Sequence, residues 1–229
     1  MSDTPKGFDE IRCLDAPLAT RLAAYVRYLE TANVDVSEIY RAIIKRLVDS
    51  GAGAQAPAVG TALPDFLLPD SDGRLHGLSD MVSRGPVVIS FNRGHWCSFC
   101  RLELLALAEV HGAIAERGAT LVSIMPEVAT EVTRLRAGLS LPFPVLTDID
   151  NGYALSCGLM VSLGPVLREY FLGRGTDLAR FQRNDGWFVP IPATFVVGAG
   201  RRILGRFVDP DFTRRMAPEE LLDFLPEIA

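Results

Sequence analysis

The spacing of apolar positions predicts two helices near the N-terminus. Over residues 17–33 and 36–50, apolar side chains recur three and four positions apart, which is the period of an amphipathic helix. Residues 51–64 are rich in glycine, alanine and proline and show no period, so we expect a linker or irregular crossing there. The pattern therefore predicts an N-terminal helical extension with its linker over residues 1–59 and a main domain over residues 60–229.

Short apolar runs alternate with helical patterns through the main domain. Its first stretch, residues 65–78, predicts two short strands around a turn at Asp70–Gly73. Because strands and helices then alternate, we expect a central sheet with helices on both faces. The predicted strands are residues 85–92, 119–126 and 143–148, and the predicted helices are a long one over 100–118, closed by Gly118, then 127–139 and 151–159.

The last third of the chain predicts a hairpin and a closing helix. Residues 192–209 have the pattern of a strand, a glycine-rich turn and a returning strand, which disfavours a dinucleotide-binding loop at Gly198 and Gly200. A C-terminal helix is expected over 217–228, with Pro218 in its first turn. The segment 160–189 is irregular or helical and unusually long for a connection. It is either a helix covering a sheet edge or an aromatic lid over a binding site.

Composition excludes several classes of partner. The chain has 229 residues, which is enough to bury a sizeable core, a formal charge of −5 and a pI near 5.3. Because its basic residues are scattered, we expect neither nucleic acid nor a membrane surface as a partner. The N-terminus lacks an apolar signal core, and no apolar run approaches the ~18 residues that span a bilayer. A cytoplasmic location is therefore expected.

The chain has four cysteines, Cys13, Cys97, Cys100 and Cys157, which are too few and too irregular for a disulfide scaffold. Cys97 and Cys100 form a Cys-x-x-Cys pair at a predicted strand-to-helix junction, and such a pair is typical of redox catalysis or metal binding. A zinc site needs a second ligand pair, which the sequence lacks, so we expect no metal and no other cofactor. Cys13 and Cys157 have no such context and are expected to be small buried apolar residues rather than reactive thiols.

Position predicts that Cys97 is the more reactive of the two cysteines. It lies where the long helix begins, and unpaired N–H groups and the dipole at a helix N-terminus stabilise a thiolate. Cys100 lies one turn further along, where it can attack a mixed disulfide formed at Cys97. Arg93, His95 and Arg101 are nearby groups that can lower the thiol pKa further, and the sequence does not decide which of them faces the sulfur.

Two further features indicate a binding surface near the pair. Ile191–Pro192 directly precedes a predicted buried strand, where a proline is expected at the start of the strand because it cannot donate a ladder hydrogen bond. Trp96 is expected to cover the cysteine pair and is compatible with a docking surface for a partner. Trp96, Ile191 and Pro192 are therefore the candidate substrate-binding residues.

Three stretches carry a resemblance to a known family: SFNRGHWCSFCRLEL at residues 90–104, IPATFVV at 191–197 and GRFVDPDFTRR at 205–215. Over roughly residues 60–228, the chain resembles the peroxiredoxin-like members of the alkyl hydroperoxide reductase and thiol-specific antioxidant family. This family lies within the thioredoxin-fold superfamily. The resemblance implies an α/β fold, a thioredoxin-like three-layer α/β/α arrangement with a central mixed sheet.

The chain departs from the family pattern at the site. Peroxiredoxins carry Pro-x-x-x-Thr-x-x-Cys, and its order places these three residues on Arg93, Cys97 and Cys100, so two of the three are replaced. The later arginine of the family would fall at about Pro192. Compared with thioredoxin, the Cys pair after Trp96 and the Ile191–Pro192 step both match. In that fold the proline is cis and lies beside the pair, leaving a backbone edge for an extended substrate.

The resulting functional prediction is a thiol–disulfide oxidoreductase. Cys97 attacks an oxidised protein, a small disulfide or a hydroperoxide, Cys100 resolves the mixed disulfide, and Pro192 shapes the docking edge. An external thiol system, such as thioredoxin or glutathione, restores the dithiol, and a homodimer is left open. One alternative is a peroxidase in which Cys100 or Cys97 is oxidised to a sulfenic acid and the other cysteine closes the disulfide. The order of the peroxiredoxin pattern points to Cys100 as the oxidised residue, whereas helix geometry predicts that Cys97 is oxidised first. The other alternative is a redox sensor or interaction module without catalysis.

Overall fold

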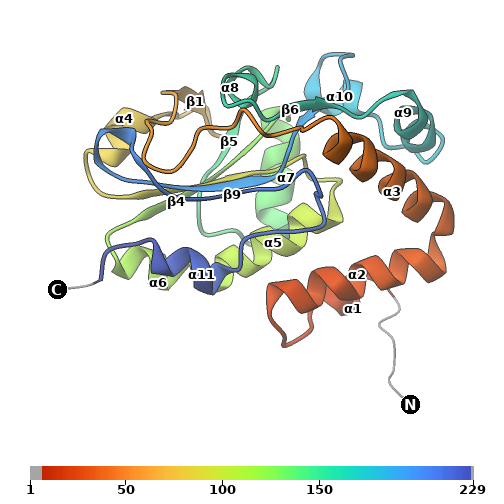
Figure 1. Cartoon of the computed structure of the whole chain (residues 1–229), viewed down its shortest axis with the longest axis horizontal. Helices are drawn as coiled ribbons and strands as arrows, with labels where there is room; N and C mark the ends of the chain where they lie inside the picture. The colour runs from red at the N-terminus through yellow and green to blue at the C-terminus, as the bar shows by residue number, and fades with distance from the viewer. Residues whose placement is uncertain (1–6, 228–229) are drawn as a thin grey trace.

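The computed structural model describes residues 7–227, which are built around a five-stranded sheet (Figure 1). The strand order is β5-β4-β3-β8-β9, in which β3 pairs in parallel with β4 and antiparallel with β8. The predicted central mixed sheet is therefore confirmed. The strands are β3 (Val87–Phe91), β4 (Thr120–Met125), β5 (Val145–Thr147), β8 (Ala193–Val197) and β9 (Ile203–Val208).

Helices cover both faces of this sheet, because alternate residues of each buried strand point to opposite sides. On β3, Val87, Ile89 and Phe91 join one hydrophobic cluster, with helices α4 (Leu78–Val82) and α8 (Gly152–Ser156). Val88 joins the cluster on the other face. The helices there are α5 (Ser98–Glu109), α6 (His111–Glu116), α7 (Ala129–Leu139) and α11 (Pro218–Asp223). The predicted three-layer α/β/α arrangement is confirmed.

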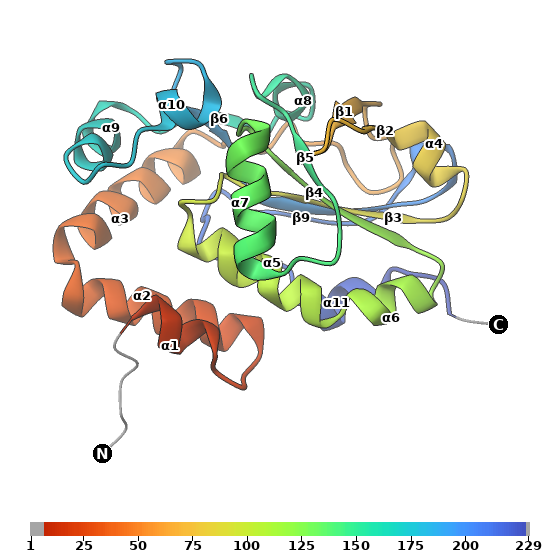
Figure 2. The same ribbon diagram turned by 180° about the vertical axis from the view of Figure 1, so that it is seen from behind.

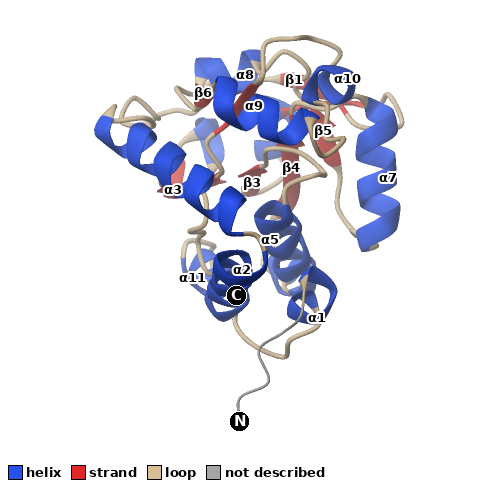
Figure 3. Cartoon of the chain, turned by 90° about the vertical axis from the view of Figure 1, so that its right-hand side faces the viewer, coloured by secondary structure: helices blue, strands red, loops and turns tan. Residues whose placement is uncertain are grey.

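The N-terminal helices pack against the end of the sheet that carries the cysteine pair. Figure 2 shows α2 beside α5, and Figure 3 shows α3 reaching α9. Apolar residues of these helices form one buried cluster with Cys97, Phe99 and Cys100. A short first helix, α1, was not predicted, since five residues are too few to show a helical period. The bounds are α1 (Phe8–Arg12), α2 (Leu18–Ala32), α3 (Val34–Asp49) and α9 (Pro165–Leu172).

The smaller elements refine the predicted pattern. The turn at Asp70–Gly73 joins the paired strands β1 (Leu67–Pro69) and β2 (Leu75–Gly77), as expected. The segment 160–189 contains α9, α10 (Leu178–Gln182) and an antiparallel pair, β6 (Met160–Ser162) with β7 (Phe188–Pro190). This strand pair was not predicted, because three-residue strands carry too little periodicity. The hairpin of β8 and β9 is confirmed, with a short 3-10 helix, Ala199–Arg201, at its turn.

The prediction of a single long helix up to Gly118 was wrong. The helix breaks at Val110, whose φ of −98° and ψ of 2° are not helical, and α6 starts at His111. The break lets α6 bury Ile114 in the core beside β4.

Gly85 is expected to be needed for the close approach of two turns. A Cβ atom on Gly85 would lie 2.2 Å from the carbonyl oxygen of Gly118, and the backbone there cannot move without shifting β3 and β4. We expect Gly85→Ala to lower the free energy of unfolding in urea by on the order of 3 kcal/mol. Gly118→Ala is the control: its Cβ would meet no atom within 4 Å, and its φ of 69° alone should cost about 1 kcal/mol. Equal losses in the two variants would contradict this explanation.

Candidate active site

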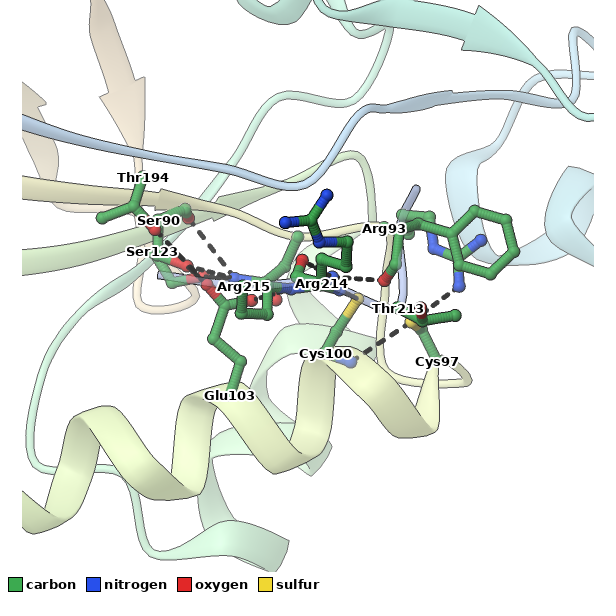
Figure 4. Close-up of polar contacts among 12 residues, drawn as sticks. Ser90, Arg93, Cys97, Cys100, Glu103, Ser123, Thr194, Thr213, Arg214 and Arg215 are labelled. Atoms are coloured by element: carbon green, nitrogen blue, oxygen red, sulfur yellow. Dashed lines mark hydrogen bonds and ion pairs between the residues drawn. The ribbon is translucent and has the colours of Figure 1, made fainter. Parts of the chain in front are cut away.

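Cys97 lies at the N-terminus of α5, directly after the loop that leaves β3 (Figure 4). It is the N-cap residue of the helix, with an extended backbone, and its Sγ atom accepts a hydrogen bond of 3.3 Å from the backbone N–H of Cys100. A helix N-terminus leaves its first N–H groups without helical partners. The Cys97 sulfur satisfies one of them in the way a serine or aspartate cap does.

Arg93 is the basic residue that contacts this sulfur. Its Nη2 atom lies 3.2 Å from the Cys97 Sγ atom, and its guanidinium carbon lies 3.8 Å from the centre of the Phe212 ring. The Arg93 side chain is buried, and within residues 7–227 its Nε and Nη1 atoms have no hydrogen-bond partner. A buried cation needs a compensating charge. The thiolate of Cys97 is the anion that contacts it.

The pKa values of the two thiols move in opposite directions. Burial opposes charge on Cys97, but the hydrogen bond from the Cys100 thiol and the positive charges of Arg93 and Arg215 outweigh it, which lowers the pKa of Cys97 to about 5. Burial raises the pKa of Cys100 well above its usual value, and the neighbouring Cys97 thiolate adds to this effect. The pair is therefore a buried thiolate beside a protonated thiol, and all four cysteines are free.

A second arginine approaches the pair from the C-terminal part of the chain. The Nη2 atom of Arg215 lies 3.6 Å from the Cys100 Sγ atom, and its Nε atom lies 2.6 Å from Oε2 of Glu103 (Figure 4). Both side chains are almost fully buried, at 1% and 2% exposure. Arg93 and Arg215 thus place one guanidinium beside each cysteine sulfur.

His95 and Arg101, the other two candidates for tuning the thiol pKa, have different partners. The His95 ring nitrogen Nδ1 lies 2.8 Å from Oε1 of Glu127, and its backbone N–H donates to Oε2 of the same carboxylate. The Arg101 guanidinium lies 4.2 Å from the centre of the Phe8 ring. Of the three candidates that the sequence left open, Arg93 is the one that donates to the Cys97 sulfur.

Ile191 and Pro192 line a cavity together with Arg93, and Pro192 does not have the predicted conformation. Arg93, Pro192 and Phe212 line a small cavity of about 10 Å³, which residues of β6 and β7 close. The peptide bond before Pro192 is trans, as are all peptide bonds of the described residues, so the prediction of a cis proline was wrong. The backbone N–H of Ile191 donates to the backbone carbonyl of Leu159. This hydrogen bond extends the pairing of β6 and β7 to the residues just before β8.

Aromatic side chains from three segments cover Cys97, which is only 2% exposed. Tyr25 of α2 packs edge-on against Phe99 at 5.0 Å between ring centres, and Tyr40 of α3 packs against Phe212 at 5.1 Å. Trp96 packs against the same buried cluster, where its ring lies 5.0 Å from the Phe171 ring of α9 and 5.3 Å from the Arg93 guanidinium carbon. The segment 160–189 therefore packs onto the cysteine loop itself.

The sequence analysis missed several residues of the site. Arg215 and Phe212 lie in the stretch that carried the family resemblance, yet nothing in their spacing indicated a contact with the pair. Glu103 carried a usable signal, since it is a carboxylate on an otherwise apolar helical face with Phe99, Cys100, Ala106 and Leu107. Tyr40 follows the apolar period of its helix and gave no sign of its place near the site.

Within the part of the chain that the structure describes, no group of three or more His, Cys, Asp or Glu side chains is arranged to hold a metal ion. Searched over the same residues, no helix has the length and apolar character needed to cross a membrane.

A central mixed sheet between two helical layers, with a thiolate and a thiol at the start of a helix, defines a redox protein of the thioredoxin fold. The sequence matches the model of the AhpC/TSA family over residues 59–204. The chain belongs to the AhpC/TSA family, whose members are thiol-dependent peroxidases and oxidoreductases. The matched residues include the cysteine pair and Pro192, while α1 to α3 and Arg215 lie outside them.

Individual relatives agree with this assignment. The thiol-disulfide oxidoreductase ResA of Geobacillus thermodenitrificans is 32% identical over 94 residues, which are 41% of this chain and 53% of the relative. A putative peroxiredoxin of Mycobacterium tuberculosis is 28% identical over 117 residues, 49% of this chain and 76% of that protein. The solved structure of peroxidoxin BcpB from Mycobacterium tuberculosis gives a TM-score of 0.56 at 22% identity, covering 72% of this chain and 94% of that one. The chain thus spans about half the length of the first of these relatives.

Proposed function

We propose that this protein is a thiol-dependent oxidoreductase that reduces a small oxidant, with Cys97 and Cys100 as its dithiol/disulfide couple. The main candidate for this oxidant is a hydroperoxide. One observation carries the proposal. The Cys97 sulfur is held as a thiolate between the Arg93 guanidinium and the Cys100 N–H, while its side chain is only 2% exposed. The thiolate is the nucleophilic form of cysteine.

The reaction proceeds in three steps. The Cys97 thiolate attacks the outer oxygen of the hydroperoxide, the O–O bond breaks, and with one proton taken up the products are a Cys97 sulfenic acid and an alcohol. Cys100 then attacks the Cys97 sulfur, which forms the disulfide and releases the hydroxyl group with the Cys100 proton as water. Two equivalents of an external thiol, from a thioredoxin or glutathione system, reduce the disulfide and are themselves oxidised to a disulfide.

Burial favours a small oxidant over a protein disulfide. A protein substrate would have to bring its own sulfur to Cys97, which is 2% exposed and lies in a buried cluster against which Tyr25, Tyr40 and Trp96 pack. A peroxide needs much less space. The Nε and Nη1 donors of Arg93, which have no partner among the described residues, lie beside a cavity about the size of one water molecule and suit a peroxide oxygen.

Reduction of disulfides is the second candidate, favoured by the contrast between the two thiols. A low-pKa first cysteine and a protonated second cysteine one helical turn away are the arrangement used in thiol–disulfide exchange. The similarity to ResA supports the same candidate. A small disulfide can reach the buried Cys97 sulfur more easily than a protein disulfide can.

A comparison of oxidants tests the proposal. We expect multiple-turnover consumption of hydrogen peroxide with dithiothreitol as the reductant, and a kcat/KM at least about tenfold higher for the peroxide than for insulin disulfides, because Cys97 is nearly inaccessible to a protein. Faster reduction of insulin would favour the second candidate. A single stoichiometric oxidation without turnover on any oxidant would instead leave a redox sensor or interaction module as the function.

A further inference from the structure

Beneath the cysteine pair lies a buried polar cluster that the three steps above leave unused. Register pairs Ser90 of β3 with Thr194 of β8 on one side and Ser123 of β4 on the other, so three hydroxyl residues form a row across the sheet. The Ser90 and Thr194 hydroxyls lie 3.2 and 3.5 Å from Oε1 of Glu103, on the helix that faces them (Figure 4). Two hydroxyl groups of this row provide hydrogen-bond donors for the Glu103 carboxylate inside the core.

Arg215 connects this carboxylate to the cysteines. Its Nε atom pairs with Glu103, its Nη1 atom donates to the backbone carbonyl groups of Phe212 and Arg214, and its Nη2 atom faces the Cys100 Sγ atom. Each nitrogen of the guanidinium therefore has a partner, and the sulfur is one of them. Because three oxygen atoms hold the Nε and Nη1 atoms, the position of the guanidinium relative to the sulfur is fixed before the reaction begins.

A structural role explains this ion pair poorly. Removing two charges from water costs free energy that their attraction only partly returns, so a buried pair is weak evidence for stability. Apolar residues of similar size would fill the same space between α5 and the sheet. What apolar residues cannot supply is a positive charge 3.6 Å from the Cys100 sulfur.

Cys100 needs such a charge in the resolving step. Its thiol is buried, and it must become negative as it attacks Cys97. The charged groups that act on it are the Cys97 thiolate, Arg93, Arg215 and, through Arg215, Glu103. Once Cys97 is oxidised, its own negative charge is gone, so Arg215 then faces the one sulfur that is gaining charge. This is the condition under which an oriented cation accelerates a reaction.

We propose that Arg215 is a further catalytic residue of the resolving step and that Glu103 is its positioning residue. Arg215 stabilises the negative charge that develops on the Cys100 sulfur while the S–S bond forms, the S–O bond of the Cys97 sulfenic acid breaks, and the Cys100 proton leaves with the hydroxyl group as water. Glu103, held by the hydroxyl groups of Ser90 and Thr194, fixes the direction of the guanidinium. The inference rests on the proposed function, because it assigns a role within its second step.

The test separates the two oxidation steps in time. The reduced full-length protein is mixed with one equivalent of hydrogen peroxide, and samples are quenched at intervals with dimedone. The intact mass of the protein in each sample is then measured by mass spectrometry. Sulfenic acid appears as the dimedone adduct, and the disulfide appears as a loss of two mass units. The ratio of the two species over time gives the rate of the resolving step independently of the rate at which Cys97 is first oxidised.

Arg215→Met combined with Glu103→Leu is the main variant, because replacing both members of a buried ion pair by apolar residues usually preserves folding. We expect its resolving step to slow at least about tenfold, with accumulation of the dimedone adduct. Arg215→Lys keeps a charge near Cys100 and should recover part of the loss. Arg214→Met is the matched control, since Arg214 is exposed and pairs with Asp209, and its resolving rate should equal that of the wild type.

Glu103→Gln tests the positioning role. It should slow the resolving step in the wild-type background and cause no further loss when Arg215 is already methionine, because Glu103 acts through Arg215. An unchanged resolving rate in the Arg215→Met, Glu103→Leu variant, with folding verified by thermal melting, would overturn the inference. If wild-type Cys97 forms neither adduct nor disulfide under the same pulse, it is the proposed function that fails.

Discussion

Replacing Cys97 by serine should abolish the reduction of hydroperoxides and of small disulfides, with a loss of kcat/KM of about a thousandfold or more. Cys97 provides the thiolate that begins both reactions. The other thiol of the pair, Cys100, has a raised pKa and stays protonated, so it cannot replace the lost nucleophile. Steady-state consumption of hydrogen peroxide with dithiothreitol measures the effect.

Replacing Cys100 by serine should have a different result, because it leaves the first step intact. The Cys97 thiolate still reacts, but its sulfenic acid or mixed disulfide persists and can be trapped with dimedone or isolated on a non-reducing gel. Cys13→Ser is the control and should retain wild-type turnover, since Cys13 is exposed, contrary to the expectation that it is buried, whereas Cys97 and Cys100 are buried. Rapid dimedone labelling of Cys100 in the Cys97→Ser variant, with little labelling of Cys97 in Cys100→Ser, would reverse the roles of the two cysteines.

Arg93→Met should have the second largest effect, through the pKa of Cys97. Burial favours the neutral thiol, and the Arg93 charge is one of the main contributions that oppose it. Without this charge, the pKa of Cys97 should rise from about 5 by roughly 1 to 3 pH units. Thiolate absorbance at 240 nm, followed against pH and corrected with Cys97→Ser, measures the shift directly.

The same variant should show a pH-dependent loss of activity. At pH 6, where wild-type Cys97 is largely ionised, the variant should react with peroxide about 2-fold more slowly for a rise of one pH unit and about 90-fold more slowly for a rise of three. The difference should narrow toward pH 9, where both proteins carry the thiolate. Arg101→Met is the matched control, because Arg101 lies over Phe8, and its titration should resemble that of the wild type. A wild-type midpoint near 9 would contradict the assignment of Arg93.

The lowered pKa also links stability to pH, with a definite sign. The pKa of Cys97 is lower in the folded protein than its usual value of 9.0, so the thiolate stabilises the fold. This contribution is fully present above pH 9 and is lost as the pH falls toward about 5. The difference in unfolding free energy between the wild type and Cys97→Ser should therefore become more favourable to the wild type as the pH rises from 5 to 9. Arg93→Met should flatten this dependence.

Local sequence was sufficient to predict most of the secondary structure and the first step of the chemistry. The alternation of apolar runs with helical periods is a short-range property, so the strands and helices that surround the pair could be predicted from it. The place of Cys97 at a helix start, with Cys100 one turn later, follows from the same pattern. Three of the shortest elements, α1, β6 and β7, were missed, because three to five residues carry little periodicity.

Which groups meet the sulfurs was decided by tertiary structure. Arg93, His95 and Arg101 all lie within four residues of Cys97, but Glu127 from the end of β4 binds His95, and Arg93 is left to contact the sulfur. The break at Val110 likewise depends on how α6 meets the core beside β4.

Residues far apart in the sequence completed the site. Arg215 reaches Cys100 across 115 positions of the chain, and Tyr25 and Tyr40 cover the pair from helices outside the matched family region. The sequence by itself determined a thiolate-forming cysteine at a helix start and a second thiol within its reach. The tertiary structure decided the burial of the pair and its two guanidinium partners, because both depend on contacts between segments whose spacing along the chain carries no periodic signal.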